Sequence, residues 1–170
     1  MGPYFGRQFD QAIKNYHKAL EMEPGFGVAH MFLGTAYAQL GRYEEAISAL
    51  QKAIELTGGS ALTKAMLGHV YAAAGDLELA RKMVADLEQT SGDNRVPSYN
   101  VALIYAGLGE TDTALHWLEE AYKQRAVFLA WINAEPMFDN LRLDSRFADL
   151  VKRIGLEPQT AIVDLSATAK

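Results

Sequence analysis

Three stretches of the chain align without gaps at a spacing of 34 residues, and this period limits the possible folds more than any other feature. They read "YAQLGRYEEA" (37–46), "YAAAGDLELA" (71–80) and "YAGLGETDTA" (105–114). A tyrosine, a glycine and an alanine stand in the same columns of all three. A fixed period of this length is typical of architectures in which one supersecondary unit is repeated and stacked on its neighbours.

Each repeat predicts two helices joined by a tight turn. Leu33, Gly34 and Tyr37 have the spacing of one helical face within 27–40, and Gly41 provides a stop for that helix. The apolar residues of 43–56 repeat the same spacing. Glycine or alanine in the columns of Gly34 and Ala46 lets two helix backbones approach closely. The sequence therefore predicts a stack of antiparallel helix pairs.

This pattern resembles the tetratricopeptide-repeat (TPR) family, whose unit has Leu-Gly, Tyr, Gly, Ala and a closing Pro in fixed columns. Leu33-Gly34, Tyr37, Gly41, Ala46 and Pro24 match these columns. The resemblance covers about residues 6–128 and implies an all-α fold, a right-handed solenoid of antiparallel helix pairs. The expected organisation is a partial unit with only its second helix (1–26), three complete units (27–60, 61–94 and 95–128), a helical C-terminal cap (129–156) and an extended or disordered tail (157–170).

The expected cap contains two similar segments nine residues apart, Glu135–Leu141 and Asp144–Leu150. In each, an acid is followed by a phenylalanine and then a leucine at intervals of three. We expect Glu135 and Asp144 to start short helices by accepting backbone N–H bonds. Asp139 and Asp149 are expected to face water. The phenylalanines and leucines would then bury the open end of the last unit.

The cap also resembles a segment that closes TPR arrays in large bacterial signalling and regulatory proteins. The resemblance implies that an effector domain precedes residue 1 in a larger parent protein. The matching residues are Trp131-Ile132, Pro136, Phe138, Leu141-Arg142, Asp144, Arg146-Phe147 and Ile154-Gly155.

The TPR resemblance implies a concave groove, lined by the first helix of each pair, that binds a protein or peptide partner. Some family members grip a terminal carboxylate with lysine, arginine and asparagine at these positions. Only Asn100 fits such a clamp here, so we expect an apolar or amphipathic partner segment instead. Packing of single side chains between neighbouring helices stays open as an alternative. The groove positions are Val28, Met31, Phe32, Thr35, Gln39, Leu62, Met66, His69, Val96, Tyr99, Asn100 and Leu103.

Self-association is the alternative function, and a homodimer is one possible product. It would use the first helix (Phe9, Ile13 and Tyr16) or the groove, with the tail of the same or a neighbouring chain as the groove's occupant. The competing interpretation of the tail is a disordered terminus.

Several function classes lack support in the sequence. The four histidines, His17, His30, His69 and His116, do not have metal-ligand spacing, and there is no glycine-rich phosphate loop. The chain has no cysteine, and its net charge of −5 argues against nucleic-acid binding. No apolar run reaches the ~18 residues that a membrane span needs. We expect a cytoplasmic, non-enzymatic protein without cofactor, bound metal or membrane insertion.

Overall fold

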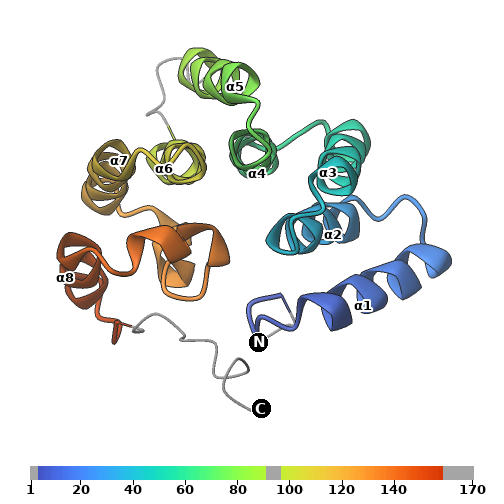
Figure 1. Cartoon of the computed structure of the whole chain (residues 1–170), viewed down its shortest axis with the longest axis horizontal. Coiled ribbons are helices and arrows are strands. Elements are labelled where there is room, and N and C mark those ends of the chain that lie inside the picture. Colours follow the sequence, from blue (N-terminus) through green and yellow to red (C-terminus); the bar gives the residue numbers. More distant parts are fainter. Residues whose placement is uncertain (1–3, 91–96, 159–170) are drawn as a thin grey trace.

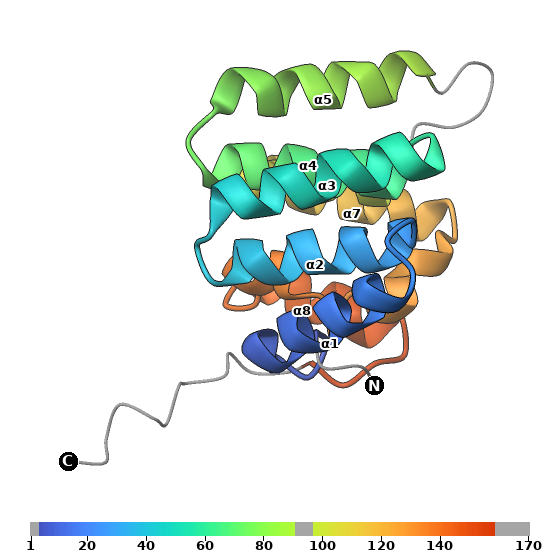
Figure 2. The same ribbon diagram turned by 90° about the vertical axis from the view of Figure 1, so that its right-hand side faces the viewer.

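The chain folds into a curved stack of helices in a computed structural model that describes residues 4–90 and 97–158 (Figures 1 and 2). No strand occurs in these two ranges, so the predicted all-α class is confirmed. The helices are α1 (Phe9–Met22), α2 (Gly27–Gln39), α3 (Tyr43–Thr57), α4 (Ala61–Ala73), α5 (Leu77–Thr90), α6 (Ser98–Gly107), α7 (Thr111–Lys123), the 3₁₀ helices η1 (Val127–Trp131) and η2 (Pro136–Leu141), and α8 (Ser145–Arg153).

Consecutive helices pack as pairs, α2 with α3, α4 with α5 and α6 with α7. In Figure 1, α2, α4 and α6 lie toward the middle of the molecule, while α3, α5 and α7 lie outside them. The stack curves until α1 and the N-terminal residues approach the orange segment that contains η1 and η2 (Figure 1). The concave side of the stack is therefore enclosed by both ends of the described chain.

The turn inside each pair repeats with the sequence period. Gly41, Gly75 and Gly109 have φ angles of +71°, +91° and +72°, which L side chains rarely adopt. After each glycine, the next N–H donates to the carbonyl of the tyrosine five residues earlier, for example from Arg42 to Tyr37 at 3.0 Å. This is the hydrogen bond expected where a helix ends at a left-handed glycine. The predicted helix stops are confirmed.

Small residues allow the helices of a pair to touch. A Cβ atom on Gly34 would lie 2.7 Å from Leu50 Cγ and 2.9 Å from the Ala46 carbonyl oxygen. Ala46 itself is fully buried, as are its counterparts Ala80 and Ala114. The columns that the repeat keeps small are therefore the positions where one helix lies directly against another.

The cap begins each of its two helical segments with an acid. Glu135 accepts the Met137 backbone N–H at 3.2 Å, and Asp144 accepts that of Arg146 at 2.9 Å. Pro136 occupies the start of η2, where a missing N–H costs nothing. The apolar residues of both segments are buried against α6 and α7 and close the end of the stack. They are Phe138, Leu141, Phe147 and Leu150.

Side-chain contacts join the cap to residues 34 positions earlier. Asn140 donates to the Ala106 carbonyl at 2.8 Å, and Arg146 pairs with Asp112 at 2.8 Å. Arg153 pairs with Glu119 at the same sequence separation. The repeat spacing thus continues through the cap, although η1 and η2 stand where a regular first helix would lie.

Among the helices that the structure describes, none has both the length and the apolar character required to cross a bilayer.

Candidate functional site

The inner surface of the stack carries the residues that the sequence predicts to line a groove. They come from α2, α4 and α6, which lie on the concave side (Figure 1). Val96 lies outside the described residues, so its position stays a prediction. Val28 is 46% exposed, and Met31, Phe32, Gln39 and Leu62 are partly exposed. The other positions are buried in the folded chain: Thr35, Met66, His69, Tyr99, Asn100 and Leu103.

An N-terminal segment, Tyr4–Arg7, covers part of the inner surface, and we call it the clasp. The Tyr4 side chain is 1% exposed, and its hydroxyl donates to Glu135 Oε1 at 2.8 Å. The Tyr4 ring centroid lies 5.9 Å from that of Phe32 on α2. The next residue, Phe5, stacks on Trp131 of η1 with 5.5 Å between centroids and 21° between ring planes. The clasp therefore connects α2 to the cap.

Arg7 completes the clasp through an ion pair with Asp139. The guanidinium donates two hydrogen bonds to the carboxylate, one of them 2.6 Å long, and Arg142 donates a third at 2.7 Å. Burial would raise the pKa of Asp139, but the hydrogen bonds from the two arginines outweigh it and lower that pKa. Asp139 was expected to face water, and it does so only in part: 39% of its side-chain surface is exposed, while its carboxylate pairs with both arginines.

Aromatic residues of the cap cover the other side of the inner surface. The Tyr99 ring on α6 meets Phe138 edge-on at 5.5 Å and lies 5.7 Å from Phe128. Tyr99 is 4% exposed as a result, and burial is the main reason that its pKa is raised. The clasp and the cap thus occupy much of the groove that the repeat pattern predicts.

One cavity of about 200 Å³ remains between the clasp, the inner helices and the cap, and we call it the inner pocket. Leu62, Met66 and the carboxylic acid Glu135 line it together with five aromatic residues. These are Phe5, Phe32, Tyr99, Phe128 and Trp131. Phe128 and Trp131 remain 39% and 48% exposed, so the pocket has accessible aromatic residues among its walls.

A second cavity of about 450 Å³ lies beside the start of α2 and α4, and we call it the rim groove. Val28, Met31 and Leu62 supply its larger apolar side chains. Leu62 lines both the rim groove and the inner pocket. The two cavities are therefore adjacent, and together they contain most of the accessible positions among the predicted groove residues.

Glu135 is the buried acid of this region, with 3% of its surface exposed. Its Oε1 atom accepts hydrogen bonds from the Tyr4 hydroxyl and the Met137 N–H. Burial is the largest influence on the carboxyl, and it raises the pKa of Glu135 above its ordinary value. Burial beside this acid also raises the pKa of Tyr4.

Two polar groove positions lie deeper. His69 is buried, and its Nδ1–H donates to the Leu103 carbonyl at 2.8 Å, linking α4 to α6. Burial lowers the pKa of His69, and the backbone hydrogen bond offsets part of this effect. Asn100 is also buried, and its Oδ1 atom has no hydrogen-bond partner among the residues that the structure describes. These positions therefore contribute to the packing of the inner helices.

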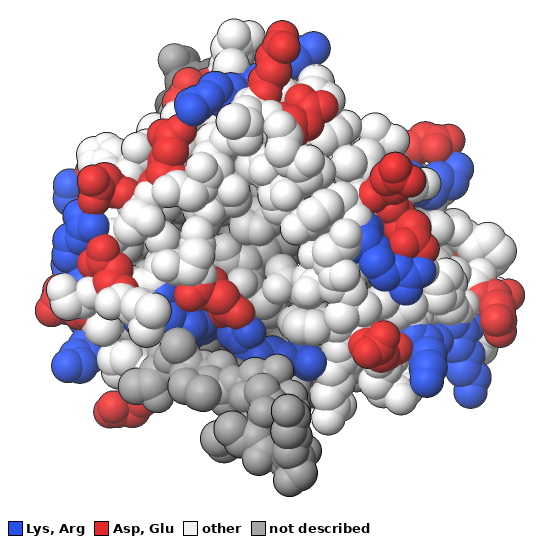
Figure 3. All heavy atoms as spheres, viewed as in Figure 1, with Lys and Arg blue, Asp and Glu red and all other residues white. Residues whose placement is uncertain are grey.

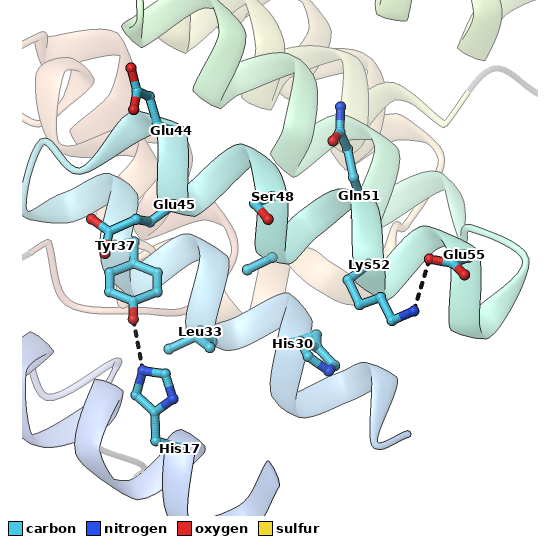
Figure 4. A pocket seen from close by; sticks show the side chains of 11 residues that line it. His17, His30, Leu33, Tyr37, Glu44, Glu45, Ser48, Gln51, Lys52 and Glu55 are labelled. Carbon is cyan, nitrogen blue, oxygen red and sulfur yellow. Dashed lines mark hydrogen bonds and ion pairs between the residues drawn. The ribbon is translucent and has the colours of Figure 1, made fainter. Parts of the chain in front are cut away.

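A polar groove of about 640 Å³ lies on the outside, between α1, α2 and α3 (Figure 4). His17 hydrogen-bonds the Tyr37 hydroxyl at 2.7 Å, and Lys52 pairs with Glu55 at 3.0 Å. No cluster of three or more histidine or acidic residues in the described part of the chain could hold a metal ion. Among the charged residues that line the outer groove, Lys52 pairs with Glu55, and Glu45 pairs with Arg42 beside it.

Two family models described as tetratricopeptide repeat match the chain, one over residues 4–61 and the other over 40–96. Together they span more than half of the 170 residues. The chain belongs to the tetratricopeptide-repeat family. No curated protein matches it. Repeats of this family imply protein–protein interaction, and the TPR scaffold is typically non-catalytic.

The repeat pattern did not reveal the TPR array's own clasp. Tyr4, Phe5 and Arg7 stand before the first recurring column, and Glu135 and Arg142 stand after the last one. Trp131 is among the residues that match the closing segment, but nothing in the sequence shows that Phe128 and Trp131 line a pocket. The prediction that Glu135, next to Pro136, starts a helix is confirmed. Nothing in the sequence, however, pairs Glu135 with Tyr4.

Proposed function

We propose that this TPR array is a protein-interaction module that binds an apolar or amphipathic segment of a partner protein along the rim groove and in the inner pocket. The observation that supports this most is the adjacency of two apolar cavities that share Leu62 on the concave side. A partner segment lying over Val28 and Met31 would place one large side chain in the inner pocket. Met31 and Met66 have flexible side chains that adapt to such an occupant.

The clasp supports the apolar character of the partner. The clasp is a short segment held on the same surface by two aromatic contacts. Tyr4 lies near Phe32, and Phe5 stacks on Trp131. In Figure 3, uncharged residues form most of the middle of the face shown, and charged residues lie mainly toward its edge. A segment with an apolar centre and polar flanks suits such a surface.

We expect Val28→Glu to weaken binding of peptides selected on the wild-type protein by about tenfold, because a charge would enter an apolar contact. The matched control is Leu77→Glu, which places the same charge at a residue of similar exposure (51%, against 46% for Val28) on α5, away from both cavities. Fluorescence polarisation of labelled peptides measures both variants. Equal losses in the two variants, or no loss in Val28→Glu, would contradict the proposal.

Self-association is less well supported. Ile13 is buried, Tyr16 stacks on Phe32 at 5.9 Å and Phe9 lies 5.9 Å from Tyr4. The apolar face of α1 is thus already used inside the chain. Residues 159–170 lie outside the described residues, so occupation of the groove by the tail stays a prediction, as does a larger signalling parent.

A further inference from the structure

The walls of the inner pocket combine aromatic rings with a single carboxylate. Its rings come from the clasp, α2, α6 and the cap, so an occupant would meet aromatic groups from several directions. Phe5 stacks on Trp131, and Tyr99 lies beside Phe128. The electron-rich faces of such rings attract cations, most strongly where water is excluded.

The carboxylate of Glu135 lacks a cationic partner. Among the residues of 4–90 and 97–158, no lysine, arginine or histidine forms an ion pair with it, and its two hydrogen bonds come from the neutral Tyr4 hydroxyl and a backbone N–H. Asp139, not Glu135, pairs with Arg7 and Arg142. Repulsion from Asp139 affects the carboxyl of Glu135 more than attraction to Arg142 does.

A buried carboxylate that forms no ion pair is costly, and a cation bound beside it would offset that cost. Because Glu135 lines the pocket, a positive group inside would lie near it and among the aromatic rings. A neutral apolar side chain would fill the same volume but leave the acid uncompensated. A guanidinium group offers several N–H donors, whereas the remaining walls are apolar, which favours an alkylated ammonium group.

We propose that the inner pocket binds an alkylammonium group, carried by a lysine or methylated lysine side chain of the partner segment. This inference deepens the proposed function and rests on it. The apolar side chains of the partner lie in the rim groove, and the alkyl stem of the lysine passes Leu62 and Met66 to place its charged end beside Glu135.

The test uses choline and its neutral isostere 3,3-dimethylbutan-1-ol, which differ in charge and hardly in shape. Titrations of the full chain are followed by the NMR signal of the Met66 methyl group. We expect choline to bind about tenfold more tightly than the isostere. Since ionised Glu135 favours choline, its affinity should fall as the pH falls through the raised pKa of Glu135, while that of the isostere should stay unchanged.

Two variants assign the preference to the pocket. Glu135→Gln retains a hydrogen-bond acceptor and should remove the preference for choline, whereas Glu119→Gln, on the outer helix α7, should leave it intact. Trp131→Leu, at a position that is 48% exposed, should weaken choline more than the isostere. Peptides that contain lysine, trimethyl-lysine or norleucine at one position then show whether a partner segment supplies the cation.

Equal affinities for the two probes, tighter binding of the isostere, or no binding of choline would overturn the inference. A choline preference that survives in Glu135→Gln would do the same. The proposed function fails separately, if peptide binding does not respond to Val28→Glu. Peptides that bind with norleucine as tightly as with lysine would leave the interaction module in place and remove only its preference for a cation.

Discussion

Small side chains determine how closely the paired helices lie. At Gly34 the α2 backbone lies so near α3 that an added methyl group would contact both the Leu50 side chain and the Ala46 carbonyl. A backbone carbonyl in a helix cannot rotate away, since it is fixed by the helical hydrogen bonds. The glycine is therefore required by packing, and its φ angle is that of an ordinary helix.

We expect Gly34→Ala to lower the free energy of unfolding by about 1–3 kcal/mol, because the added methyl group overpacks the contact between α2 and α3. Gly25→Ala is the control, since a Cβ at Gly25 has no neighbour within 4 Å and should be neutral or slightly stabilising. Urea unfolding followed by circular dichroism measures both. A Gly34→Ala variant as stable as Gly25→Ala would show that α2 and α3 lie further apart.

At the scale of elements, the cap replaces a regular helix pair by two 3₁₀ helices and α8. Its hydrogen bonds and ion pairs to α6 and α7 keep the 34-residue spacing, as in Asn140 to Ala106 and Arg146 to Asp112. Its acids serve different roles. Asp144 is partly exposed, and its hydrogen bonds from Arg146 lower its pKa to about 2, whereas Glu135 is buried.

Phe138→Ala should lower the free energy of unfolding by about 3–5 kcal/mol, because the ring is fully buried against Tyr99 and Phe147. Asp144→Ala removes a hydrogen bond at the start of α8, at a partly exposed position, and should cost clearly less. Thermal unfolding of the two variants compares them directly. If Asp144→Ala proved as damaging as Phe138→Ala, the cap would be held by its charges and not by its buried rings.

Much of this architecture could be predicted from the sequence, because most contacts in a repeat fold join residues at short, regular sequence intervals. Leu33, Gly34 and Tyr37 indicate a helix face within a few residues, and Gly41 indicates its end. The three-residue intervals from Phe138 to Leu141 and from Phe147 to Leu150 likewise indicate a buried helix face. Such features need no knowledge of how the units stack in space.

The clasp could not be predicted in this way. Tyr4 and Glu135 are 131 positions apart, and they meet only because the packing angles of every intervening pair add up to a nearly closed curve. The ion pair between Arg7 and Asp139 could not be predicted for the same reason, because the two residues are 132 positions apart. The repeats place the predicted groove residues on the first helix of each pair, but how much of that surface is accessible depends on the whole molecule.

In the whole molecule, the clasp covers the concave side and leaves the inner pocket open. Trp131 reports on this directly, because Phe5 stacks on it. Trp117 is the other tryptophan, so Trp117→Phe leaves Trp131 as the sole tryptophan. In that background, the full chain with Tyr4, Phe5 and Arg7 replaced by serine is compared with one carrying serine at the exposed α1 residues Gln11, Lys14 and Lys18.

Acrylamide quenching of Trp131 fluorescence is the decisive measurement. We predict that the clasp variant is quenched markedly more strongly than its parent, while the α1 control is unchanged and circular dichroism shows the same helix content in all three. If Trp131 is quenched equally in the clasp variant and its parent, the N-terminal segment does not cover the inner surface, and the inner pocket is not bounded by the clasp.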